Sequence, residues 1–128
     1  MRTRDQVFAA EAFKKVCDFK AKHDKAAHKK YGSMAHKLPV LIRTAGLAQA
    51  LAFLEARGDT HQKQLLTDLK NVLGQNNLVE RSRKVELGEY ARLTRECLAA
   101  LLWFKRYAQS VLDVNASDGP EVGDAKPA

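Results

Sequence analysis

The sequence predicts an all-α fold, a compact bundle of four main helices with possible short additional helices. Proline and glycine are few, at three and seven of 128 residues, and residues that helices tolerate well predominate. Apolar residues also recur at helical spacing over long segments. A chain of this length with 45% hydrophobic residues suits a single core. We therefore expect one helical domain over residues 1–112. Residues 113–128 contain too little apolar surface to offset the entropy of ordering, and we expect a disordered tail there.

The first helix is expected over residues 3–30. Thr3 followed by Gln6 has the spacing of a capping box, which marks a helix start. Apolar positions then share one side, within a sector of about 80°. These positions are Phe8, Ala12, Val16, Phe19, His23 and Ala26. We expect this side of the helix to face the core.

Glycine, proline and capping residues divide the remaining chain. Tyr31-Gly32-Ser33 is expected to end the first helix, and a second is expected over residues 34–56, with Pro39 favouring a separate turn over 34–38. A break at residues 58–60 precedes a third helix that ends at Gly74. Residues 78–84 fit either a brief helical turn or an exposed connection. The last helix is expected over residues 85–112.

The positive charge of the chain is concentrated near its beginning. Residues 1–43 contain 11 Lys or Arg against four Asp or Glu, whereas residues 44–128 contain 11 of each. The formal net charge of +7 therefore belongs to the first third of the sequence. A concentrated positive field attracts polyanions, so this asymmetry favours contact with nucleic acid.

Two groups of basic residues are candidates for that contact. The first is a ridge on the outer side of the first helix, about 22 Å long at the helical rise, which continues into the second helix. It consists of Lys14, Lys15, Lys22, Lys25, Lys29, Lys30, Lys37 and Arg43. The second is a stripe formed by Arg81, Lys84, Arg92, Arg95 and Arg106 if the last helix extends back to residue 80. The alternative interpretation of the ridge is a solvated charged face.

The sequence contains no recognisable catalytic or metal-binding pattern. The four histidines lack zinc-site spacing, and His23-Asp24 lacks the further ligands of metal phosphohydrolases. Arg57 and His61 resemble the pair used by helical-bundle ribonucleases, but only three residues separate them and a glycine intervenes. We expect a protein that is not an enzyme and has no metal or cofactor. A bundle ribonuclease using Arg57 and His61 is the alternative.

The cysteines and two aromatic residues have structural interpretations. Cys17 and Cys97 lie within predicted helices and are expected to be unpaired thiols. Trp103 and Tyr107 are candidates for subunit contact, and Trp103 is expected to touch a neighbouring helix or subunit before a base. No signal peptide and no apolar stretch of membrane-spanning length is present, so we expect a cytoplasmic protein.

Two segments resemble a known protein family. Residues 30–54 contain the tyrosine-glycine, leucine-proline and glycine-leucine-x-glutamine-x-leucine run of the small subunit, the fifth Cmr protein, of type III-B CRISPR effector complexes. Residues 101–108 resemble the C-terminal helix of that family. The matching positions are Tyr31, Gly32, Leu38, Pro39, Gly46, Gln49 and Trp103. The similarity extends over about residues 3–112.

The resemblance implies a non-catalytic subunit of an RNA-guided antiviral ribonucleoprotein. Family members stack in several copies opposite the subunits that hold the guide, and target cleavage belongs to those guide-holding subunits. The implied partners are guide RNA, target RNA, other Cmr subunits and copies of the chain itself, with no membrane. A further alternative is a module that binds only protein. In that case the basic residues form a solvated surface and do not contact RNA.

Overall fold

The structure, a computed structural model that describes residues 1–117, is helical and contains no strand in that range. Its helices are α1 (Arg4–Lys22), α2 (Lys25–Ala45), α3 (Leu47–Arg57), α4 (Thr60–Leu73), α5 (Leu78–Lys84) and α6 (Leu87–Ser110). The predicted all-α bundle is confirmed. Over the described residues, none of the helices has the length and apolarity needed to cross a membrane.

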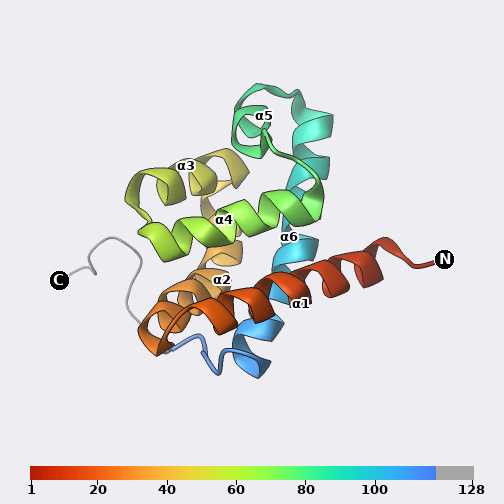
Figure 1. The fold of residues 1–128 in the computed structure, drawn as a ribbon. Helices are drawn as coiled ribbons and strands as arrows, with labels where there is room; N and C mark the ends of the chain where they lie inside the picture. Colours follow the sequence, from red (N-terminus) through yellow and green to blue (C-terminus); the bar gives the residue numbers. More distant parts are fainter. Residues whose placement is uncertain (118–128) are drawn as a thin grey trace.

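The two longest helices form the centre of the bundle. α6 packs against both α1 and α2, and α4 lies beside α1 on one side of this centre (Figure 1). α3 contacts α2 and α4, whereas the short α5 packs on α3 at the end of the molecule away from α1 (Figure 1). α1 and α4 therefore form one continuous face of the protein.

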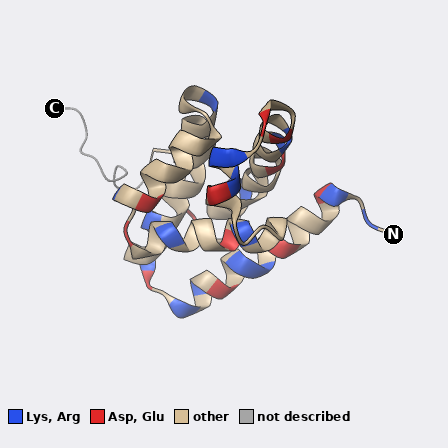
Figure 2. Cartoon of the chain, turned by 90° about the horizontal axis from the view of Figure 1, so that it is seen from above, with Lys and Arg blue, Asp and Glu red and all other residues tan. Residues whose placement is uncertain are grey.

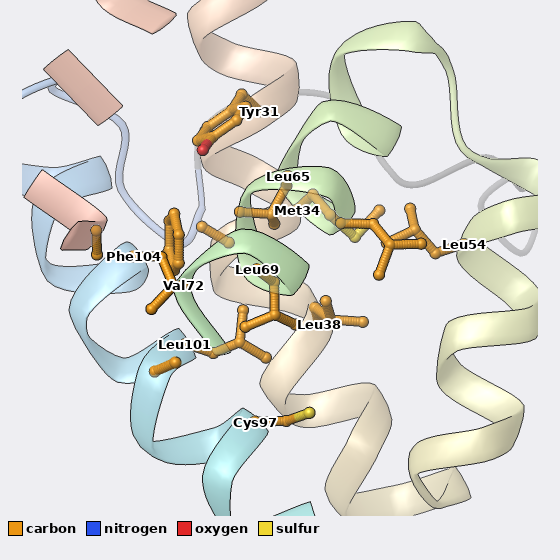
Figure 3. Close-up of a cluster of buried hydrophobic side chains, with 14 of the residues drawn as sticks. Tyr31, Met34, Leu38, Leu54, Leu65, Leu69, Val72, Cys97, Leu101 and Phe104 are labelled. Carbon is orange, nitrogen blue, oxygen red and sulfur yellow. The ribbon is translucent and has the colours of Figure 1, made fainter. Parts of the chain in front are cut away.

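All six helices within residues 1–117 contribute large side chains to the core. Figure 3 shows residues of α2, α3, α4 and α6 meeting at its centre, namely Tyr31, Met34, Leu38, Leu54, Leu65, Leu69, Val72, Cys97, Leu101 and Phe104. From α1, the predicted apolar positions Phe8, Ala12, Val16 and Phe19 are also buried. Burial of apolar surface on this scale supplies the main stabilisation of the fold.

Several predicted helix ends are confirmed. Thr3 and Gln6 form the expected capping box, in which each side chain bonds the other residue's backbone, at 3.0 and 2.8 Å. Asp59 and Gln62 form a second one at the start of α4. Gly74 ends α4 in the left-handed conformation, with φ of 68°. Residues 78–84, left open by the sequence, form the short helix α5.

The predicted helix over residues 3–30 is wrong, because the chain breaks at His23. α1 ends at Lys22, and Asp24 caps a new helix by accepting a hydrogen bond from the Ala27 amide at 3.0 Å. That amide holds the pKa of the Asp24 carboxyl below its ordinary value. His23, which we placed on the core side, is exposed at the junction.

The predicted stop at residues 31–33 is also wrong. α2 continues through this segment and through Pro39, and ends only at Gly46, whose φ is 93°. Gly32 is buried where the chain following α6 crosses it, and a Cβ there would lie 2.7 Å from the Cβ of Val114. This glycine therefore serves close approach inside a helix. The single helix predicted over 34–56 is consequently the end of α2 plus all of α3.

The first residues of the predicted tail are part of the packed domain. Val114 is buried, and its amide donates to the Ala108 carbonyl at 2.8 Å. Its carbonyl accepts a hydrogen bond from Nε2 of the buried His36 at 2.9 Å. The ordered domain therefore reaches at least residue 114 and not 112. Residues 118–128 of the predicted tail lie outside the described residues.

Both cysteines are free thiols in the described structure, as predicted. Cys17 is half-buried, whereas Cys97 is buried in the core beside Leu101 and Leu38 (Figure 3). Burial, together with the neighbouring Glu96, raises the pKa of the Cys97 thiol to about 12. Cys97 therefore acts as a small core residue.

We predict that Gly32→Ala destabilises the protein by about 1–3 kcal/mol in urea unfolding, because the added methyl group overlaps Val114. In a Val114→Gly background, which removes the Cβ and both Cγ atoms that the added methyl group would meet, the same change should cost less or become stabilising, because alanine favours a helix by up to about 1 kcal/mol over glycine. An equal loss of stability in both backgrounds would contradict this packing role.

Candidate nucleic-acid interface

The break at His23 divides the predicted ridge between two helices. α1 carries five basic residues and three acidic ones, which are interspersed along the helix that starts at the N-terminus (Figure 2). α2 contains no acidic residue. Its five basic residues are Lys25, Lys29, Lys30, Lys37 and Arg43. The surplus of positive charge is therefore divided between α1 and α2. Its lysines lie on both sides of the turn between these helices and do not follow one helix.

A groove runs between α1 and α4, and we call it the α1–α4 groove. It is lined by Lys15, Asp18, Phe19, Lys22, His23, Gln64, Asp68 and Asn71. Lys15 and Lys22 lie about two turns apart on α1, and Gln64 and Asn71 have the same spacing on α4. The α1 wall thus presents two lysines together with Asp18, whereas the α4 wall presents two side-chain amides together with Asp68.

A buried hydrogen bond lies beneath this groove. The Tyr31 hydroxyl donates to Oδ2 of Asp68 at 2.6 Å, and Nε2 of Gln64 donates to Oδ1 at 2.9 Å. Burial raises the pKa of Asp68 above its ordinary value, although the hydrogen bonds from Tyr31 and Gln64 oppose this shift. Burial and the Asp68 carboxylate raise the pKa of the Tyr31 phenol well above its usual range. The tyrosine therefore remains a hydrogen-bond donor at neutral pH.

Aromatic rings connect the core to the edge of the groove. Phe19 stacks on Tyr31 on the core side and on His23 on the surface side, with ring centroids 4.1 Å apart in each pair. His61 at the start of α4 packs nearly perpendicular to the rings of Phe19 and His23, at 5.8 and 5.0 Å. The position of His23 is thus fixed by two neighbouring helices.

A second groove lies on the other side of the α1–α2 turn, and we call it the C-terminal groove. It is lined by Lys20, Lys25, His28, Lys29, Val111, Leu112, Asp113 and Val114. His28 is buried there and its Nε2 bonds the Lys20 carbonyl at 3.1 Å, which joins the end of α1 to α2. Three lysines therefore border the segment that follows α6.

The other predicted ridge residues lie outside these grooves. Lys14 is exposed and pairs with Glu11 at 3.8 Å, and Lys30 pairs with Asp59 at 3.5 Å. Lys37 is half-buried and Arg43 is exposed near the end of α2. The structure thus brings Lys15 and Lys22 together in one groove and Lys25 and Lys29 in the other.

The second predicted stripe does not form on one helix, because the chain turns at Val85 and Glu86 between α5 and α6. Three of its five members instead pair with nearby acids. Glu89 accepts from both Arg81 and Arg92, and Glu80 accepts from Lys84 at 2.8 Å. Arg95 is exposed on α6. Local pairing leaves this stripe less able to attract an anion than the lysines of the grooves.

Trp103 and Tyr107 fasten α6 to α1. The Trp103 indole donates to Asp5 at 3.0 Å, and the Arg106 guanidinium lies 5.3 Å from the centre of its ring. Tyr107 stacks on Trp103 and meets the exposed Phe13 edge-on at 5.2 Å. The predicted contact of Trp103 with a neighbouring helix is confirmed, whereas a role in subunit contact stays a prediction.

Each residue of the alternative ribonuclease pair packs against aromatic rings. His61 packs against Phe19 and His23, and the Arg57 guanidinium lies 6.0 Å from the centre of the Phe53 ring. Within residues 1–117, no group of three or more His, Cys, Asp or Glu side chains is arranged to hold a metal ion.

Sequence reasoning missed several residues of the two grooves. Lys20 was not selected because it does not project with the ridge, and Gln64 and Asn71 carry no charge. Asp24 offered the one local signal, because aspartate is a preferred helix cap. Its capping role would have predicted the break and the exposure of His23.

These features define a small all-α protein with two lysine-bordered grooves beside the α1–α2 turn. Residues 4–111 match the family described as "CRISPR-associated protein (Cas_Cmr5)". The chain belongs to this Cmr5 family.

A relative and a solved structure support that assignment. The chain is 48% identical over 116 residues to the "CRISPR system Cmr subunit Cmr5" of Thermus thermophilus, covering 88% of this chain and 99% of the relative. It is also similar to the crystal structure of a CRISPR-associated Cmr5 family protein from Thermus thermophilus, with a TM-score of 0.80 and 50% identity. That match covers 86% of this chain and 98% of the other.

The raised pKa of Asp68 predicts a pH-dependent stability. The folded state binds the Asp68 proton more tightly than the unfolded state. The resulting stabilisation of the folded state is complete below about pH 4 and is lost as the pH rises through the raised pKa of Asp68. Compared with Asp68→Asn, the natural protein should lose up to about 1.4 kcal/mol of unfolding free energy per pH unit in that window. Urea titrations from about pH 4 to 7 measure this difference, and parallel curves would contradict it.

Proposed function

We propose that this chain is a non-catalytic structural subunit of a cytoplasmic type III-B Cmr complex and contacts guide or target RNA through its two grooves. The observation that carries the proposal is the clustering of five lysines around the α1–α2 turn. They are Lys15, Lys20, Lys22, Lys25 and Lys29. None of them forms an ion pair within residues 1–117. Lys15 interacts electrostatically with Asp68 across the α1–α4 groove, so Lys20, Lys22, Lys25 and Lys29 carry the charge most available to a polyanion.

The chemistry of these residues favours contacts with phosphates. A lysine ammonium is a compact charge on a flexible stem, which suits phosphate binding but does not read a base edge with fixed geometry. Phosphate contacts position a protein on RNA without selecting sequence. A subunit of this kind would therefore accept any guide or target sequence.

Assembly with other Cmr subunits is supported by the similarity to the Thermus thermophilus Cmr subunit. Stacking with further copies of the same chain belongs to the proposal as well. Large apolar side chains are exposed on different helices and are available for protein contacts. They are Phe13, Val40, Leu87 and Leu102.

We predict that the groove lysines determine the salt dependence of RNA binding. Replacing Lys22, Lys25 and Lys29 by alanine should reduce the slope of log affinity against log salt by about 0.7 for each phosphate that is no longer neutralised, or about 2 in total. Fluorescence anisotropy of a labelled single-stranded RNA with the full chain measures the slope. A matched variant that replaces Lys63, Arg83 and Lys105, which lie outside both grooves, should keep it. An unchanged slope in the groove variant would contradict the assignment.

The non-catalytic role predicts that the purified chain does not cleave RNA. End-labelled RNA incubated with the natural protein should remain as intact as RNA with His61→Ala or with buffer alone. Cleavage by the natural protein that disappears in His61→Ala would support the ribonuclease alternative. RNA crosslinking in the assembled complex separates the proposal from a module that binds only protein, because the latter would give no crosslink to this chain.

A further inference from the structure

The ring of His23 is the exposed end of an aromatic column that starts in the core. Tyr31 is fully buried and Phe19 is 3% exposed, whereas His23 is an exposed residue. Each ring is centred 4.1 Å from the next, with interplanar angles of 29° and 28°. The column therefore ends in a nearly parallel ring at the surface of the α1–α4 groove.

The backbone at the α1–α2 junction places this ring beside the groove, and the helix cap does not use its side chain. His23 has an extended conformation between α1 and α2, and Asp24 supplies the cap that starts α2. His61 braces the ring from α4 at a centroid distance of 5.0 Å. A side chain that is exposed, held on two sides and unused by the cap is suited to contact a ligand.

The surroundings of the ring combine charge with neutral hydrogen-bonding groups. Lys15 and Lys22 line the α1 wall of the groove together with Asp18. Gln64 and Asn71 line the α4 wall together with Asp68, whose carboxylate oxygens already accept hydrogen bonds from Tyr31 and Gln64. The Asn71 side chain makes no hydrogen bond within residues 1–117, and Gln64 uses only its Nε2 toward Asp68. Both amides thus offer donors or acceptors to a ligand in the groove.

We propose that the α1–α4 groove binds an unstacked nucleotide of single-stranded RNA, with its base stacked on His23 and its phosphates on Lys15 and Lys22. This inference rests on the proposed function and adds a base-stacking site to the phosphate contacts. Aromatic side chains bind bases of any sequence in this way, and lysines follow the backbone. An acidic peptide would use the lysines but would have no use for the aromatic column. A duplex keeps its bases paired, so the site would distinguish single strands from duplexes.

The test compares His23→Ala with His23→Phe in the full chain, using a fluorescein-labelled oligouridylate of about ten nucleotides and fluorescence anisotropy. His23→Ala should weaken binding by about 5- to 100-fold, the range expected for loss of one base stack. His23→Phe retains a flat ring and should bind within about threefold of the natural protein. The salt slope should stay unchanged in both, because neither variant removes a phosphate contact.

Two controls make the result specific. Lys105→Ala, which removes an exposed charge outside both grooves, should bind like the natural protein. Binding of a labelled RNA duplex should be equal in the natural protein and in His23→Ala. Urea unfolding of each variant checks that the junction between α1 and α2 is intact.

The outcomes distinguish this inference from the function on which it rests. If the natural chain does not bind the RNA at all, the proposed function fails and the base site fails with it. If it binds, and His23→Ala binds equally well, only the base site is overturned and the phosphate contacts stand. The base site would also be overturned if His23→Ala and His23→Phe weakened RNA binding equally. The same holds if polyglutamate displaced the labelled RNA from the natural protein as strongly as unlabelled RNA does.

Discussion

The hydrogen bond between Tyr31 and Asp68 is the interaction on which the face formed by α1 and α4 depends. A carboxylate buried in a core is unfavourable unless hydrogen bonds compensate it, and here Tyr31 supplies one of them. The bond joins α2 to α4, and the same tyrosine ring stacks on Phe19 of α1. Three helices are therefore held around one polar group. The α1–α4 groove lies directly over this junction, so the core determines its width and the position of His23.

The helix ends that the sequence predicted correctly are those set by neighbouring residues. Thr3 with Gln6 and the left-handed Gly74 act within a few residues of the helix they end, so a short segment of sequence contains the necessary information. Gly32 could not be interpreted this way, because its role depends on Val114 at the other end of the domain. In the sequence this glycine resembles a helix end, but in the structure it lies inside α2 and permits the close contact with Val114.

The location of the positive charge was also predictable, whereas its arrangement was not. Counting residues identified the first third of the chain, because net charge does not depend on folding. The division of the lysines between two grooves follows from the Asp24 cap, which starts α2 as a separate helix after α1. Likewise, Arg81 loses its place in a basic stripe because the turn after α5 brings it to Glu89. His23 was misplaced because the apolar periodicity of α1 continues past the residue where the helix ends.

The central claim is that the basic α1–α4 face contacts RNA in the assembled complex. A cryo-electron microscopy map of that complex with bound target RNA tests it most directly. The account predicts nucleic-acid density along the groove bordered by Lys15 and Lys22, with a base against His23. A map in which this groove is filled by a neighbouring protein subunit, with RNA elsewhere, would contradict it.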